Sequence, residues 1–173
     1  MKKHTFRRCA AIFAACATML TALPVAQISA SAADLISNGT FEGSTSGWGM
    51  YKESGGSATL SSENGRLALK IINTGKVTYA VQMFYDIIPL YQNGVYHLKY
   101  DISCTTNRFV EGMIQQNGGT YQAYTWKGLN LTSEPQTVDY EFTMEAESDI
   151  MAKLVFNCGL QESDGRSEEH TSE

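Results

Sequence analysis

The chain has 173 residues, a formal net charge of −5 and 18% charged residues, and this length is enough for one domain with a hydrophobic core. Residues 34–165 contain 8 Lys and Arg against 15 Asp and Glu, a net charge of −7. Such an acidic segment is a poor candidate for binding nucleic acid or an anionic membrane. A neutral polysaccharide remains compatible with it.

Residues 1–33 have the pattern of a cleaved signal peptide. Basic residues at positions 2–8 precede an apolar run from 9 to 22, and Ala30-Ser31-Ala32 supplies the small-residue cleavage pattern. The apolar run is short for a membrane span. We therefore expect a secreted, bacterial, extracellular protein with no membrane anchor.

The last eight residues, 166–173, show no apolar periodicity and resemble the translation of a common sequencing adapter. We expect them to be non-native, so that the domain spans 34–165 and the chain is a fragment of a longer protein.

The pattern between these ends predicts an all-β domain. Segments rich in Val, Ile, Tyr, Phe and Thr are separated by Gly- and Asn-containing turns. A first strand is expected at 38–42 and a second at 47–51. The other predicted strands are 66–72, 78–88, 95–104, 108–117, 137–143 and 151–158. Short strands at this spacing favour a sandwich of two antiparallel sheets.

Alternation assigns faces to two of these strands. In 95–104, the even positions from Tyr96 to Cys104 form one face, and His97, Lys99 and Asp101 form the other. In 108–117, apolar Val110 and Ile114 share one face, and a row of polar side chains occupies the other. That face carries Glu111, Gln115 and Asn117, with Met113 between the first two. In 47–51, the same parity places Trp48 opposite Tyr51 and indicates that Trp48 is a packing residue.

An ordered series of short motifs resembles the family 4 carbohydrate-binding modules (the family 4/9 type) that are attached to cellulases. The series consists of Gly39-Thr40-Phe41-Glu42, Gly47-Trp48-Gly49-Met50-Tyr51, Tyr79-Ala80-Val81, Gly94 to Tyr100, Gln116 to Tyr121, Leu131 to Pro135 and Leu154 to Gly159. The resemblance implies a jelly roll of the galactose-binding-like type with a sugar-binding cleft across one sheet. The final strand of the family is absent, which agrees with truncation.

The resemblance also implies a site and a role. Cleft positions match Tyr51, Tyr79, Asn117, Tyr121 and Asn157. Asp86 stands where the family often has an amide, and Glu111 replaces a basic residue. Aromatic faces cover sugar rings, and amides or carboxylates bind hydroxyls, so Gln115 joins this group from its strand face. The implied function is non-catalytic binding of soluble β-glucan, cellulose or xylan chains. The domain would be monomeric and tethered to a glycoside hydrolase.

No cofactor is required by this reading, but family modules commonly hold one structural calcium. Thr40, Glu42 and Gly65 match two parts of that site, and the last ligand would lie in the missing strand. Calcium prefers the carboxylate and carbonyl oxygens that these positions offer.

Three questions stay open in the sequence. Cys104 and Cys158 could form a disulfide or remain buried thiols. The same sandwich could instead serve as an adhesion or structural module of a cell-surface protein. A small glycoside hydrolase would need two facing carboxylates. Asp86 and Glu111 are the one tempting pair, and we expect no catalytic residues.

Overall fold

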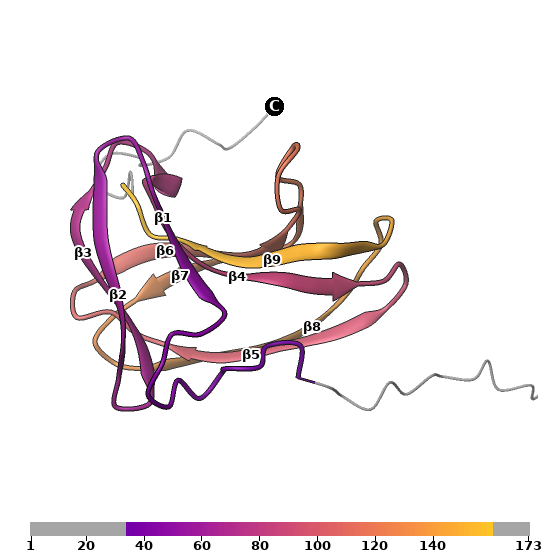
Figure 1. The fold of residues 1–173 in the computed structure, drawn as a ribbon, viewed down its shortest axis with the longest axis horizontal. Helices are drawn as coiled ribbons and strands as arrows, with labels where there is room; N and C mark the ends of the chain where they lie inside the picture. The colour runs from indigo at the N-terminus through magenta and orange to yellow at the C-terminus, as the bar shows by residue number, and fades with distance from the viewer. Residues whose placement is uncertain (1–33, 161–173) are drawn as a thin grey trace, which may run out of the picture. The chain divides into compact units, whose positions relative to one another are not determined.

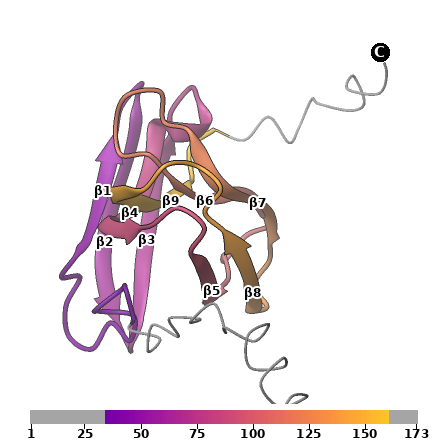
Figure 2. The ribbon, with the colours of Figure 1, turned by 90° about the vertical axis from the view of Figure 1, so that its right-hand side faces the viewer.

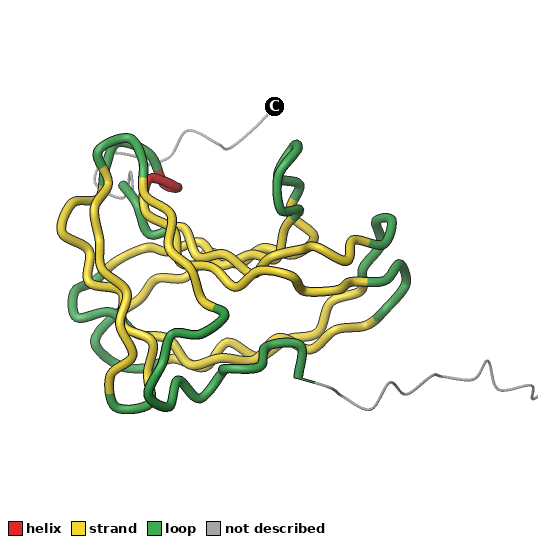
Figure 3. Tube along the Cα trace, viewed as in Figure 1, coloured by secondary structure: helices red, strands yellow, loops and turns green. Residues whose placement is uncertain are grey.

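The computed structural model describes residues 34–160. The expected signal peptide at 1–33 and the expected foreign tail at 166–173 lie outside the described residues. Within 34–160 the regular structure is nine strands and one short 3-10 helix (Figure 3). These elements are β1 Trp48–Lys52, β2 Gly56–Glu63, β3 Arg66–Thr74, η1 Thr78–Ala80, β4 Val81–Leu90, β5 Val95–Ile102, β6 Arg108–Gln115, β7 Ala123–Leu131, β8 Gln136–Thr143 and β9 Asp149–Asn157. No helix in this part of the chain is long and apolar enough to cross a membrane.

Five strands form one antiparallel sheet in the order β1-β4-β9-β6-β7 (Figure 1). Its central strand is β9, the last one in the described chain, and both neighbours of β9 come from much earlier in the sequence. Most of β9 is buried, as expected for a strand covered on both faces. The centre of the sheet therefore depends on pairings between residues far apart along the chain.

The other four strands form two antiparallel pairs, β2 with β3 and β5 with β8. The β5–β8 pair lies across one face of the five-stranded sheet (Figures 1 and 2). Tyr100 of β5 packs edge-on against Phe156 of β9 with ring centroids 5.2 Å apart, and Tyr140 of β8 accepts a hydrogen bond from Thr125 of β7. The β2–β3 pair lies beside β1 (Figure 2).

One hydrophobic core fills the space between these layers. Alternate residues of the five-stranded sheet point into it, and the fully buried ones include Val81, Leu90 and Leu154. The inward face predicted for 95–104 is confirmed, because Leu98 is buried in this core and Tyr96, Tyr100, Ile102 and Cys104 pack against it. His97, Lys99 and Asp101 are exposed, as that alternation requires.

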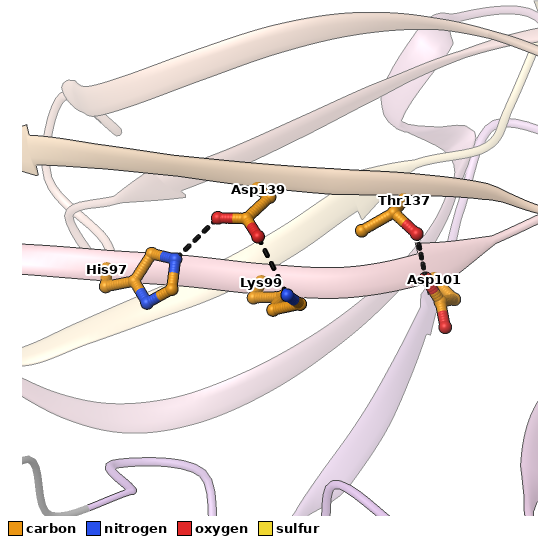
Figure 4. A network of polar contacts seen from close by, with 5 residues as sticks. All are labelled: His97, Lys99, Asp101, Thr137 and Asp139. Carbon is orange, nitrogen blue, oxygen red and sulfur yellow. Dashed lines mark hydrogen bonds and ion pairs between the residues drawn. The ribbon is translucent and has the colours of Figure 1, made fainter.

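The exposed face of the β5–β8 pair carries a small polar network (Figure 4). Asp139 contacts His97 at 2.6 Å and Lys99 at 2.8 Å, and Thr137 donates a hydrogen bond to Asp101. Lys99 and Asp139 are directly opposite across the strand pair. Cross-strand pairs of this kind fix the register of two strands.

The predicted all-β antiparallel sandwich is confirmed, with one layer divided into two pairs. All strands predicted from position 47 onward are present within a few residues of their expected bounds. The expected strand at 38–42 is wrong, because this segment has no strand pairing. In this segment the side chain of Asn38 instead donates to the backbone carbonyls of Ser44 and Ser46. The backbone carbonyl of Asn38 accepts a hydrogen bond from the Trp48 indole. The segment thus fixes Trp48, which packs edge-on against Phe41 and Tyr85.

Candidate functional site

The outer face of the five-stranded sheet, turned away from β5–β8, carries the candidate site. On β9, Ala152, Leu154 and Phe156 point into the core. Strand alternation therefore places Lys153, Val155 and Asn157 on the outer face. The same parity places Glu111, Met113 and Gln115 of β6 there, because Val110 and Ile114 belong to the core. The faces predicted for 108–117 are therefore confirmed up to Gln115, where β6 ends.

One row of paired residues crosses all five strands on this face. The register pairs Tyr51 with Gln82, Gln82 with Asn157, Asn157 with Glu111, and Glu111 with Gly128. We call these residues the polar row. They belong, in order, to β1, β4, β9, β6 and β7, so the row runs perpendicular to the strands.

Hydrogen bonds link the three central members of the polar row, Gln82, Asn157 and Glu111, from strand to strand. The Gln82 amide donates to Asn157 at 2.8 Å, and the Asn157 amide donates to Glu111 at 3.0 Å. The other Glu111 carboxylate oxygen accepts from the indole N–H of Trp126 at 3.3 Å. Each side chain is therefore held by its neighbour, and a fixed set of polar atoms faces outward.

An apolar row lies directly beside the polar row. Here the register pairs Gly49 with Phe84, Phe84 with Val155, Val155 with Met113, and Met113 with Trp126. The Phe84 ring covers Gly49 so closely that a β-carbon there would collide with it. Val155 is 0% and Met113 7% exposed, so Phe84 and Trp126 are the side chains of this row that solvent reaches. They stand beside the polar row, and a sugar ring with an apolar face and a hydroxyl edge requires this combination.

Three exposed tyrosines accompany these rows. Tyr51 is 45% exposed, Tyr79 47% and Tyr121 58%. Tyr51 donates to Glu53 at 2.7 Å. That hydrogen bond raises the pKa of Tyr51 above its ordinary value, and Tyr121 and Tyr79 add smaller electrostatic contributions. The three tyrosines named from the sequence thus gather at one end of the face.

Tyr121 is held in place by its loop and by a lysine. The β6–β7 loop stands away from the sheet on the side opposite β5–β8 (Figure 1), and Tyr121 adopts a left-handed backbone conformation with φ of 54°. Lys153 is 8% exposed, and its ammonium lies 5.5 Å from the Tyr121 ring centroid and 5.6 Å from that of Phe84. Such cation–π contacts hold both rings against the lysine.

The remaining predicted site residues lie on or near the same face. Asn117 donates to Asp86 at 3.3 Å, so these two form a pair beyond the end of β6. Gln115 is buried opposite Lys153. Both oxygens of Glu111 accept hydrogen bonds from other side chains.

The sequence placed Met113 on this face but missed several other residues of it, namely Gln82, Phe84, Trp126, Lys153 and Val155. Trp126 is the most exposed of them at 49%. It was missed because β7 was not predicted. The alternation of Trp126 and Gly128 with Leu129 and Leu131 was the available signal.

The expected calcium residues come together only in part. Gly65 has a left-handed φ of 71°, and a β-carbon built on it would lie 3.6 Å from the carbonyl oxygen of Thr40. Glu42 lies in the same N-terminal segment as Thr40. Among residues 34–160, no three His, Cys, Asp or Glu side chains lie close enough to hold a metal ion together. Carbonyl oxygens and one carboxylate would have to supply the ligands.

Cys104 and Cys158 are both free thiols. Burial raises the pKa of Cys158 to about 12, which keeps it protonated and unreactive at neutral pH. The disulfide that the sequence left open is not formed.

Comparison with known proteins agrees with this geometry. A family model described as a carbohydrate-binding domain matches residues 33–164. Endoglucanase C of Cellulomonas fimi is 30% identical over 136 residues, which is 79% of this chain but only 12% of that enzyme. The chain therefore spans about an eighth of the length of this relative.

Solved structures show the same fold. A structure described as "CBM4 structure and function" gives a TM-score of 0.66 at 23% identity, with 72% of this chain and 89% of that chain covered. The N-terminal cellulose-binding domain of the C. fimi β-1,4-glucanase C gives 0.60 at 26% identity, with 73% and 86% covered. The match to the family model covers all of the described residues, and this chain therefore belongs to the family 4/9 carbohydrate-binding domains.

Proposed function

We propose that this domain binds single, soluble chains of a β-linked polysaccharide, a β-glucan or a xylan, on the outer face of the five-stranded sheet. The observation that carries the proposal is the pairing of the polar row with the apolar row, with three exposed tyrosines at one end. Amides and a carboxylate bind hydroxyl groups, and aromatic rings cover the apolar faces of the sugar.

A single chain suits this face better than a flat crystal surface. A crystal surface would need a planar row of exposed aromatic rings, whereas Gln82, Asn157 and Glu111 occupy the middle of the polar row. These groups can reach the edges of one chain lying along them. Two C. fimi domains of similar fold are described as cellulose-binding, which supports a glucan as the first ligand to test.

We further propose that the domain holds an attached glycoside hydrolase on its substrate. The signal-peptide pattern of 1–33 supports export, and the relative in C. fimi is an endoglucanase. Tethering raises the effective concentration of cleavable bonds around the enzyme without any new chemistry. Polysaccharide would be the partner, and the domain itself would act as a monomer.

Affinity electrophoresis and calorimetry on a panel of soluble β-1,4-glucan, mixed-linkage β-glucan, β-1,3-glucan and xylan test this proposal. Retardation by at least one of them, with a Kd on the order of micromolar to millimolar, is expected because sugars must shed bound water. Crystalline cellulose should bind more weakly than the best soluble chain. If no soluble chain is retarded, the binding role is wrong, and an adhesion role for the sandwich gains support.

A further inference from the structure

Trp126 lies on the binding face but apart from the tyrosines. It belongs to β7, at the opposite edge of the sheet from Tyr51 on β1. Its side chain is 49% exposed, and it ends the apolar row beyond Met113. None of the expectations from the sequence assigned it a role. A half-exposed tryptophan on a strand has one ring face packed against the protein and the other exposed to solvent.

The ring of Trp126 is fixed rather than free to rotate. Its indole N–H donates to Glu111 at 3.3 Å, and Glu111 is itself held by Asn157 at 3.0 Å. Gly128, next to it on the same face, has no side chain. A β-carbon on Gly128 would lie 3.0 Å from the Trp126 ring and 2.8 Å from the Phe109 ring. The rings of Trp126 and Phe109 therefore occupy the space that a side chain at position 128 would need.

The hydrogen-bonded chain from Gln82 through Asn157 and Glu111 ends at Trp126. One end of the polar row is thus Tyr51, an exposed aromatic ring, and the other end is bordered by Trp126. Adjacent strands are about 4.8 Å apart, so the four steps from β1 to β7 span roughly 19 Å. The polar atoms that can bind hydroxyls lie between the two rings.

We propose that Trp126 is a further sugar-stacking platform, and that a bound chain runs across the strands from Tyr51 to Trp126. The proposal rests on the proposed function and adds a contact residue and the extent of the ligand. Glu111 then acts chiefly as a positioning residue, because its two oxygens hold Asn157 and Trp126. The ligand class that fits is an extended β-linked chain, since a short oligosaccharide can occupy only one end of the row.

Fluorescence can report on Trp126 directly. The chain has two tryptophans. Trp48 packs between Phe41 and Tyr85, so Trp126 is the more accessible to a soluble quencher. We expect a bound polysaccharide to shift the emission and to protect it from acrylamide. The Trp126→Phe variant should lose both effects and still bind, because its ring is smaller but remains flat.

Affinity for chains of different length gives a second test. Trp126→Ala should weaken binding of a long chain on the order of tenfold, comparable to losing about 1.4 kcal/mol. It should leave binding of a short oligosaccharide at the tyrosine end nearly unchanged. Gly128→Ala should act in the same direction by displacing the ring. Tyr91→Ala is the matched control, because Tyr91 is an exposed aromatic residue of the β4–β5 turn.

Glu111→Gln tests the positioning role. A glutamine has one acceptor oxygen and cannot accept from both Asn157 and Trp126. We expect the long-chain preference to fall while short-chain affinity changes less, and the Trp126 emission of the free protein to shift. A purely structural role for Glu111 would lower the melting temperature without altering the dependence on chain length.

The outcomes separate the two proposals. If a polysaccharide binds without changing the tryptophan emission or its quenching, and Trp126→Ala does not alter the dependence on chain length, the platform is wrong and the proposed function stands. If the tyrosine variants weaken binding and Trp126→Ala does not, the ligand is confined to the tyrosine end. If no polysaccharide binds at all, both proposals fail together.

Discussion

The carboxylate of Asp139 on β8 lies 2.6 Å from the imidazole Nε2 of His97 on β5 (Figure 4). The same carboxylate lies 2.8 Å from the ammonium of Lys99. The hydrogen bonds that Asp139 accepts from His97 and Lys99 hold the pKa of Asp139 below its ordinary value, and the bond that Lys99 donates to Asp139 raises the pKa of Lys99. Because all three side chains are exposed, solvent screens the network.

This network predicts a small acid sensitivity. A carboxyl whose pKa is lower in the folded than in the unfolded protein stabilises the fold above its unfolded pKa, about 3.9. That contribution disappears as the pH falls through the folded value. The melting temperature of the wild type should exceed that of Asp139→Asn slightly at pH 6, and the difference should shrink as the pH falls below the unfolded pKa. Glu147→Gln, a change at another exposed carboxylate, serves as the control. A difference that stays constant across this range would contradict the assignment.

Tyr121 gives the clearest prediction for the proposed binding. Removing its ring with Tyr121→Ala should cost roughly 1–3 kcal/mol of binding free energy, judged from the apolar area that the ring would cover. Because Tyr121 is 58% exposed, the melting temperature should change little. Calorimetry with the best soluble polysaccharide measures the first effect, and thermal unfolding measures the second.

Asn117→Ala should weaken binding as well. The change leaves sugar hydroxyls without a partner and also removes the hydrogen bond from Asn117 to Asp86. The loss should appear in the calorimetric Kd and not in the melting temperature, because Asn117 is exposed. Wild-type affinity in both Tyr121→Ala and Asn117→Ala would show that the tyrosine end is not the site.

Alternation predicted the faces of β5 and β6 correctly because each strand has one face in the core. The same reasoning failed for β7, where Lys127 stands among core-facing positions and breaks the apolar pattern. The structure explains this residue, since the Lys127 ammonium lies 4.7 Å from the Tyr140 ring centroid at the edge of the sheet. β2 was missed because its sequence is rich in serine and offers little apolar alternation.

The polar row could be predicted only in pieces. Parity places Glu111 on an outer face, but its neighbours there are set by strand order. Asn157 and Glu111 are 46 residues apart along the chain, and they meet because β9 pairs with β6. Whether Glu111 faces a ligand or holds other side chains depends on Trp126, which belongs to a third strand. The periodicity of a single segment does not show which residues of other strands will lie beside Glu111.

Calcium binding remains a proposal that can be tested on the whole chain. The carbonyl of Thr40 lies beside the Gly65 turn, and Glu42 could add one carboxylate. A site with one charged ligand should be weak, so we expect half-saturation at roughly 0.1–1 mM, the range of extracellular modules. Added Ca²⁺ should raise the melting temperature, and EDTA or Glu42→Gln should remove the gain. Mg²⁺ at the same concentration is the control, because it demands a stricter geometry. An unchanged melting temperature with Ca²⁺ would mean that the site does not form.

The last prediction concerns the free edges of the two strand pairs, β2–β3 and β5–β8. Within residues 34–160, β3 pairs only with β2, and β5 pairs only with β8. Each strand of these two pairs therefore has one edge without a strand partner, and such edges invite association with other chains. A further strand after residue 165, which the family resemblance predicts, would pair with one of these edges.

A protein ending at residue 165 should therefore melt early and tend to aggregate, and replacing 166–173 with the genomic continuation should correct both. Each kcal/mol gained by pairing these edges would raise the melting temperature by roughly 2–8 °C for a domain of this size. A Gly/Ser extension of the same length is the control, because it adds chain without strand-forming residues. Differential scanning calorimetry and light scattering measure the two effects. A high, cooperative melt of the shorter protein that the continuation leaves unchanged would mean that the described strands already form a complete sandwich.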